Sequence, residues 1–231
     1  GRLFEDPTAR LGLTRLAWQG TGFGTVLADF DRDGDLDLAI ANGRVRREVS
    51  QYSPRPAAAP ATDFWSAYRE RNQLLELTEP GGFVDRSTAE TAFSVSPGVY
   101  RSLVLADFDN DGAPDLLVTQ IDGPARLFRN IAPQRGDWLA IRAVDPRWRR
   151  DAYGAVVEVR SGRRQWQRTA SPAFSYLASN DPRVFFGLGN AHPVDEVRVH
   201  WPDGFTEVFS TVAVNQIQTL HRGQGRPLNP P

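Results

Sequence analysis

The chain has 231 residues, of which 40% are hydrophobic and 24% charged, a composition that is ordinary for a soluble globular protein and sufficient for one large or two small domains. The formal net charge of −1 excludes the strongly basic character of nucleic-acid-binding proteins. The absence of cysteine excludes disulfides, thiolate metal sites and thiol nucleophiles, and every apolar run is too short to span a bilayer.

Short apolar segments separated by Gly, Asp and Asn turns run through the first 135 residues and predict β-strands. The strands are expected at residues 23–28, 36–41, 72–77, 102–106, 116–119 and 125–129. Between the second and third of these, the Pro/Ala-rich stretch 52–62 predicts a solvated loop, and residues 64–71 are compatible with a short helix.

An internal repeat organises these strands. The hexapeptide Leu27-Ala-Asp-Phe-Asp-Arg returns as Leu105-Ala-Asp-Phe-Asp-Asn, an offset of 78 residues. A Phe-x-Asp segment precedes each copy, as Phe4-Glu-Asp6 and Phe83-Val-Asp85. A unit of this length has room for four short strands and an insertion, which favours an all-β propeller or sandwich.

Each repeat contains an Asp-rich loop with the spacing of a metal site. Both loops have Asp at positions 1, 3, 5 and 9 and Gly at position 6, where a positive φ folds the loop over an ion. Position 7 is expected to supply a backbone carbonyl, and in the first loop it is also an Asp. The predicted ligands are Asp29, Asp31, Asp33, Asp35 and Asp37 in the first loop, and Asp107, Asp109, Asp111, Ala113 and Asp115 in the second.

The chemistry of these ligands selects calcium. Oxygen-only ligands favour Ca²⁺ or Mg²⁺ over zinc and copper, and a flexible loop with many carboxylates favours the larger ion. An EF-hand needs a bidentate Glu at position 12, but that position holds Ile40 in one loop and Val118 in the other. An aliphatic strand follows each loop instead, so we predict two calcium sites that each bridge a β-hairpin.

The second half of the chain, from about Gly136, predicts a separate β domain. Several segments alternate apolar and polar residues, as half-buried strands do. The strands are expected at residues 138–144, 155–160, 165–169, 184–187, 197–201 and 206–209. The domains are therefore predicted as 1–135 and 136–222, with 223–231 as a disordered tail.

The sequence shows no catalytic constellation. His192, His200 and His221 lack the spacing of a metal site, and no nucleophile elbow, P-loop or dinucleotide fingerprint occurs. Arginines do surround two tryptophans, which predicts a surface that docks an acidic partner, a polysaccharide or lipid headgroups, although a solvated strand face is the alternative. The members of this predicted partner surface are Arg147, Trp148, Arg149, Arg150, Arg163, Arg164 and Trp166.

The Asp loops resemble the FG-GAP/VCBS repeats of integrin-α-like β-propellers. The second half resembles the ASPIC/UnbV family, the cartilage-acidic-protein-like group, on four motifs. These motifs are Tyr153-Gly-Ala-Val-Val-Glu-Val, Ser175-Tyr-Leu-Ala-Ser, Phe186-Gly-Leu-Gly189 and Val194-Asp-Glu-Val-Arg-Val-His-Trp201-Pro-Asp-Gly204. The resemblance implies a partial β-propeller, since only two repeats occur, followed by a β-sandwich-like ASPIC/UnbV domain.

We therefore expect a non-enzymatic, calcium-binding extracytoplasmic module for protein or glycan interaction, whether secreted, periplasmic or at the cell surface. Neither a nucleic-acid partner nor a transmembrane segment is expected. Two alternatives remain at this point. The chain could be an accessory or structural subunit of a larger periplasmic or membrane-associated complex, because the propeller is incomplete, or it could be a hydrolase or lyase that acts on polysaccharide.

Overall fold

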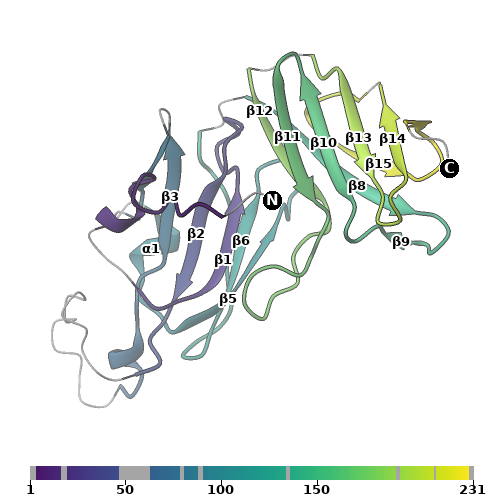
Figure 1. Cartoon of the computed structure of the whole chain (residues 1–231). Coiled ribbons are helices and arrows are strands. Elements are labelled where there is room, and N and C mark those ends of the chain that lie inside the picture. Colours follow the sequence, from purple (N-terminus) through teal and green to yellow (C-terminus); the bar gives the residue numbers. More distant parts are fainter. Residues whose placement is uncertain are drawn as a thin grey trace.

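The computed structural model describes residues 4–16, 20–46, 63–78, 81–87, 91–133, 136–190, 193–210 and 212–228. Their regular structure is almost entirely β, arranged in four sheets. Two sheets, of four and three strands, lie side by side at one end of the molecule, and the other two form the C-terminal domain, residues 136–228 (Figure 1). The predicted solvated loop at 52–62 lies outside the described residues.

The first repeat folds into a four-stranded antiparallel sheet, here called the first blade. The strands run in chain order, and they are β1 (Gly22–Ala28), β2 (Asp37–Asn42), β3 (Gln73–Thr78) and β4 (Gly82–Asp85). Instead of the helix predicted at 64–71 there is only a single 3-10 turn, η2 (Ser66–Tyr68). The chain is already extended at Arg69, which pairs with Asp63 and Asp122, so the helix cannot continue.

The second repeat gives a matching sheet with three strands, here called the second blade. The strands are β5 (Tyr100–Ala106), β6 (Asp115–Gln120) and β7 (Arg126–Phe128), preceded by the one-turn helix α1 (Ala92–Val95). The registers are equivalent, since Ala28 faces Asp37 in one blade and Ala106 faces Asp115 in the other. The repeat is thus confirmed at the level of strand pairing, although no described residue adds a fourth strand beside β7.

The two blades pack through their first strands, β1 and β5 (Figure 1). Gly24 allows this close approach, because a Cβ there would lie 2.5 Å from the Cβ of Leu103. Val26, Leu103 and Val118 belong to the shared apolar core. A buried ion pair joins Arg44, which follows β2, to Glu70, which precedes β3, at a distance of 2.9 Å.

The C-terminal domain is a sandwich of two sheets. One has the order β11-β10-β13-β14-β16; the other has the order β12-β8-β15, with β9 beside β8. The strands are β8 (Asp137–Asp145), β9 (Arg150–Asp151), β10 (Val156–Ser161), β11 (Arg164–Thr169), β12 (Val184–Gly189), β13 (Glu196–His200), β14 (Thr206–Phe209), β15 (Gln216–His221) and β16 (Arg226–Pro227). Outside the sheets, η1 (Leu13–Arg15) is a short 3-10 turn near the N-terminus.

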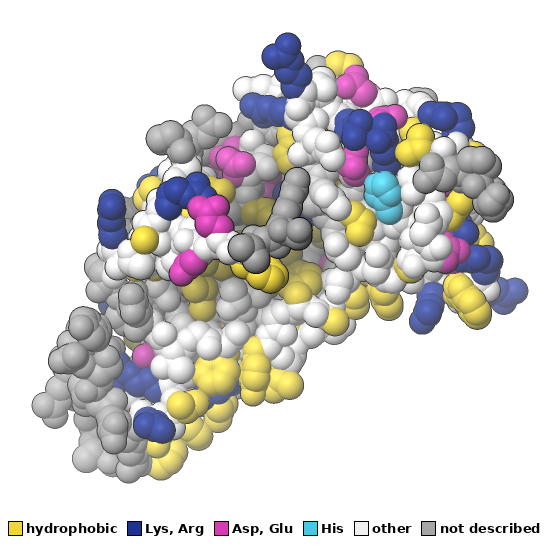
Figure 2. All heavy atoms as spheres, in the orientation of Figure 1, with side chains coloured by type: hydrophobic (Ala, Val, Ile, Leu, Met, Phe, Trp, Pro, Cys, Tyr) yellow, Lys and Arg dark blue, Asp and Glu magenta, His cyan; other side chains and the backbone are white. Residues whose placement is uncertain are grey.

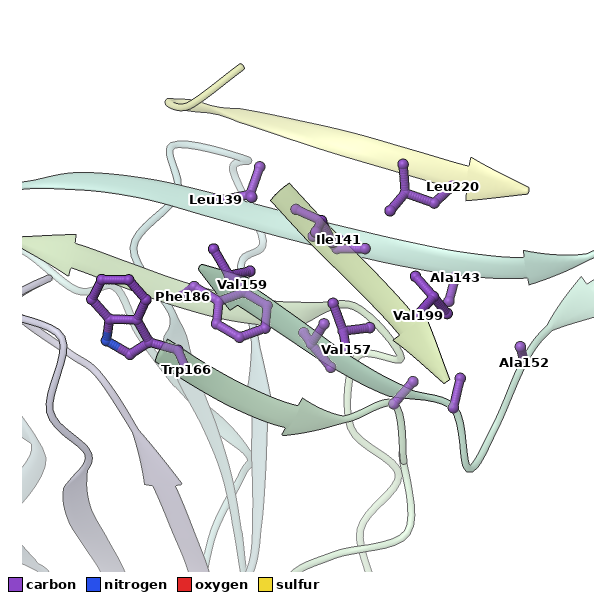
Figure 3. Close-up of a cluster of buried hydrophobic side chains, with 14 of the residues drawn as sticks. Leu139, Ile141, Ala143, Ala152, Val157, Val159, Trp166, Phe186, Val199 and Leu220 are labelled. Atoms are coloured by element: carbon purple, nitrogen blue, oxygen red, sulfur yellow. The ribbon is translucent and has the colours of Figure 1, made fainter. Parts of the chain in front are cut away.

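Alternate residues of the facing strands fill the sandwich core. Ile141 of β8, Val159 of β10 and Phe186 of β12 point toward one another, and Trp166 lies at the edge of this cluster nearest the first blade (Figure 3). The fold class predicted from the sequence, all-β with a partial propeller followed by a sandwich-like domain, is confirmed.

The prediction of a disordered tail is wrong for residues 223–228. Arg226 and Pro227 form β16, which pairs with β14. The backbone amides of Gly223 and Gly225 donate to the buried carboxylate of Glu207, each at 3.0 Å. These contacts anchor the segment because they satisfy a buried acidic group that would otherwise lack donors.

Candidate metal centres

The two Asp loops, residues 29–37 and 107–115, join the first two strands of each blade and have the same backbone shape. Gly34 and Gly112 at position 6 have positive φ, 103° and 85°, as the sequence predicted. Position 4 is also left-handed in both loops, with φ of 65° at Arg32 and 59° at Asn110. Asn tolerates this region, but for Arg it is uncommon, and nothing in the first loop's sequence predicted it.

Three carboxylates converge in each loop. One oxygen from each of positions 1, 3 and 9 lies within 4.8 Å of the others. The groups are Asp29, Asp31 and Asp37 in the first loop, and Asp107, Asp109 and Asp115 in the second. The structure therefore brings together three of the four predicted Asp positions in each copy.

Positions 5 and 7 differ from the prediction in part. Asp33 and Asp111, at position 5, are outside the convergent groups, and each accepts a hydrogen bond at 2.9 Å from the backbone amide two residues on. At position 7 the side chain of Asp35 is exposed, whereas Ala113 is buried. The carbonyl ligands expected from these two residues stay a prediction.

Backbone donors hold the convergent carboxylates in the same way in both loops. Gly34 donates to Asp29 and Gly112 to Asp107, each at 2.9 Å. The position-9 carboxylates also accept a hydrogen bond from outside the loop. In the first blade, the backbone amide of Leu77, in β3, donates to Asp37 at 2.9 Å. In the second loop Asn130 donates in the same way to Asp115, at 2.7 Å. Each position-9 Asp thus ties its loop to the third strand of the blade or to the residues that follow it.

The buried carboxylates of the first loop would be stabilised by a cation. Burial raises the pKa of Asp29 to about 6 and that of Asp37 to about 7, from an ordinary 3.8. One oxygen of Asp29, Oδ1, is buried and has no hydrogen-bond partner among the described residues. Three buried carboxylates with an unpartnered oxygen fit a hard divalent cation, because the ion supplies the charge and the contact that are missing.

The second loop is more exposed and already partly compensated. Asp109 is exposed, and Arg129 forms ion pairs with Asp109 and Asp111. Burial still raises the pKa of Asp107. The donor set fits the same cation, but Arg129 already pairs with Asp109, one of the three convergent carboxylates.

The predicted partner surface is divided in the structure. Trp148 is 67% exposed in the turn between β8 and β9, whereas Arg163 and Arg164 lie at the other end of β10. Trp166 is only 8% exposed, and its Nε1 donates to the carbonyl of Gly34 at 3.1 Å. On the face seen in Figure 2, the Arg side chains are scattered over the C-terminal domain and do not gather into one patch. Trp166 faces the first blade and does not belong to an exposed surface, whereas the rest of the partner surface stays a prediction.

The residues that sequence reasoning missed come from the C-terminal domain and touch both loops. Besides Trp166, they include Trp138, Arg183 and Gly187. A cavity of about 320 Å³ between the first loop and this domain is lined by Asp29 and Arg168, among others. No local pattern reveals such contacts, because they join residues that are far apart in the chain.

Comparison with known proteins assigns both parts. Residues 146–227 match the family model described as ASPIC and UnbV, and residues 61–118 match the one described as FG-GAP-like repeat, which includes the second Asp loop. Cartilage acidic protein 1 is 28% identical over 245 aligned residues in both Homo sapiens and Mus musculus. These alignments cover 87% of this chain and 36% of each relative, so the chain spans about a third of their length.

A backbone protein of the group B streptococcus pilus 2b aligns with a TM-score of 0.24 and 9% identity over 86% of this chain and 96% of that chain, a similarity too weak to indicate a shared fold. No helix among the described residues is long and apolar enough to cross a membrane. The two family-model matches and the curated relatives confirm the resemblance seen in the sequence: one part of the chain is similar to an FG-GAP-like repeat, and the part that follows it is similar to the ASPIC/UnbV domain.

Proposed function

We propose that this chain is a non-enzymatic, calcium-binding extracytoplasmic module for interaction with proteins or glycans. The observation that carries the proposal is the pair of matched carboxylate groups, Asp29, Asp31 and Asp37 in one blade and Asp107, Asp109 and Asp115 in the other. Two copies of one geometry, each with its own backbone donors, support metal sites over ordinary acidic turns. We assign one calcium ion to each loop.

The type of domain supports a location outside the cytoplasm. Other calcium sites in extracellular modules have dissociation constants of about 10⁻⁴–10⁻³ M, and sites of similar affinity here would be occupied only where calcium is abundant. The curated relatives are named for cartilage and for acidic character. Because the chain spans only about a third of those relatives, the activity of the whole protein is part of the proposal.

Interaction is a better-supported role than catalysis. Among the described residues, the groups with metal-type spacing are the two Asp-loop triads, and their carboxylates are committed to the ion. Trp148, with exposed Arg149 and Arg150 beside it, is an exposed aromatic part of the predicted partner surface. An amphipathic ring flanked by guanidinium groups suits an acidic protein or an anionic glycan.

Calorimetric titration of calcium into the metal-free chain tests the proposal. We expect two bound ions per chain and a higher melting temperature that EDTA reverses. Magnesium is the matched control, and it should bind more weakly because it demands strict octahedral geometry. No heat of binding together with no effect of EDTA on melting would refute the proposal. Turnover of any member of a glycan panel would favour the hydrolase or lyase alternative.

A role within a larger assembly has one observation in its favour. The second blade ends at β7, beside which Leu127 and Ile131 are 54% and 83% exposed. An open strand edge with apolar side chains commonly pairs with another chain or segment. Sedimentation of the calcium-loaded chain as a strictly monomeric species up to high concentration would argue against self-association through this edge.

A further inference from the structure

Both Asp loops lie under the C-terminal domain, and each glycine at position 6 touches a tryptophan of that domain. We propose that each loop is also a docking site for the C-terminal domain, so that calcium controls whether this domain is held against the blades. The inference rests on the proposed calcium binding and adds a mechanical consequence to it: the C-terminal domain is released when the ions leave.

Trp166 and Trp138 make the two equivalent contacts. Trp166 donates from Nε1 to the carbonyl of Gly34 at 3.1 Å, and a Cβ on Gly34 would lie 3.0 Å from that nitrogen. In the second loop, a Cβ on Gly112 would lie 2.1 Å from the ring of Trp138. Both tryptophans are only 8% exposed. Position 6 therefore has to be glycine for two reasons, its positive φ and the ring that covers it.

Strand β12 of the C-terminal domain lies directly on the first loop. The backbone amide of Gly189 donates to the carbonyl of Arg32 at 3.0 Å. Gly187 is closer still, because a Cβ there would lie 1.9 Å from Oδ2 of Asp29 and 2.6 Å from the Cα of Arg32. A predicted calcium ligand is thus in contact with the backbone of the other domain.

The segment before β12 fastens the second loop in the same way. Arg183 donates to the carbonyl of Asp107 at 2.9 Å and to the side chain of Asn110 at 2.6 Å. Two residues earlier, the amide of Asp181 donates to the carbonyl of Leu105, at the end of β5, at 3.0 Å. The docked surface therefore includes both loops and the strand that leads into the second one.

The nature of these contacts explains why docking depends on the ion. The loop atoms that the C-terminal domain binds are mainly backbone carbonyls, those of Arg32, Gly34 and Asp107, so the domain requires a particular loop conformation. That conformation crowds carboxylates together, which opposes it in the absence of a cation, and in the first loop it also places Arg32 in the left-handed region. Calcium offsets the repulsion and holds the carbonyls in place.

Binding linkage makes the coupling reciprocal. If the ion favours docking, docking must favour the ion by the same factor, for which values of about 5–150-fold are typical. A change in the C-terminal domain that blocks docking should therefore weaken calcium binding, even though no residue of that domain belongs to the convergent triads. If the ion had no influence on docking, the same change would leave calcium affinity unaltered.

Spectroscopic labels on the full chain provide the first test. The chain has no cysteine, so Ile121→Cys in the second blade and Tyr153→Cys in the C-terminal domain, both about half exposed, accept labels selectively. With calcium we expect one narrow distribution of label-to-label distances. In EDTA we expect a broad one, while hydrogen exchange shows that the strands of the sandwich stay protected. The same narrow distribution in both conditions, or loss of protection in both domains at once, would overturn the proposal.

The variant Gly187→Ala is the second test, and Gly82→Ala is its matched control. Both glycines lie in strands without positive φ, but a Cβ at Gly82 meets its nearest atom only at 3.8 Å. We expect Gly187→Ala to broaden the distances in calcium and to weaken one calcium site by at least about fivefold. The control should behave like the parent chain. Unchanged calcium affinity and distances in Gly187→Ala would overturn the proposal.

The two tests separate this inference from the function on which it depends. If calorimetry detects no calcium binding, the proposed function fails and the inference fails with it. If two ions bind but the labels report the same docked state with and without them, only the inference fails. The comparison of calcium with EDTA needs no substitution at the interface, so it remains decisive even where Gly187→Ala does not fold.

Discussion

Replacing Asp31 or Asp109 by Asn should remove one calcium site at a time. Both residues are at position 3, and in each the oxygen Oδ1 accepts a hydrogen bond from the amide two residues on, at 3.2 Å and 3.3 Å. The amide oxygen of Asn can keep that bond. The substitution therefore removes a charged ligand from the ion and leaves the loop's internal hydrogen bond intact.

The size of the effect follows from having two sites. With a dissociation constant of about 0.1 mM, 10 mM calcium is about 100-fold above it and stabilises the folded state by about 2.7 kcal/mol per site. Two sites give about 5 kcal/mol, which for a chain of this size raises the melting temperature by roughly 10–20 °C. Either single variant should lose about half of that increase, and the double variant nearly all of it.

Thermal melts followed by circular dichroism, in 10 mM calcium and in EDTA, measure this directly, and calorimetry counts the ions. Glu5→Gln, at an exposed acidic residue that belongs to neither loop, controls for the loss of one charge. The reasoning is refuted if Asp31→Asn keeps two bound ions and the full increase in melting temperature. It is also refuted if Glu5→Gln loses as much as the loop variants.

Three further changes test other parts of the structure. Arg129→Ala should raise calcium affinity at the second loop by less than about fivefold, measured by calorimetry, because Arg129 no longer competes for Asp109; weaker binding would contradict this. Glu70→Ala should destabilise the chain by about 3–5 kcal/mol in urea, because it leaves Arg44 buried and unpaired, yet two ions should still bind. Gly24→Ala should lower the urea midpoint by overpacking β1 against β5, at a cost of about 1–3 kcal/mol, and an unchanged midpoint would show that the blades can separate.

The strands and the Asp loops could be predicted because their signals are local. Alternation of apolar residues specifies a strand, and Asp at every second position with Gly at position 6 specifies a tight acidic turn. Positions 1, 3 and 9 converge as expected, but Asp33 and Asp111 bind backbone amides instead of joining them. Spacing alone does not distinguish a carboxylate that faces the ion from one that caps the turn, since both uses place Asp at the same positions.

The contacts between the domains could not be predicted, because they depend on how separate sheets pack. Trp166 has arginines on both sides in the sequence and suggested an exposed basic surface, yet it is buried against Gly34. Alternation along β11 shows which residues share a face, but not what covers that face. The order at the C-terminal end was missed for a similar reason, since it depends on Glu207, well before the tail in the sequence.

A crystal of the full chain grown with 10 mM calcium, with anomalous scattering used to locate the ions, tests the central claim most directly. The account predicts one ion in each Asp loop, bound by Asp29, Asp31 and Asp37 in the first and by Asp107, Asp109 and Asp115 in the second. The account would be contradicted if neither loop showed anomalous density at that calcium concentration while the three carboxylates of each loop still converged.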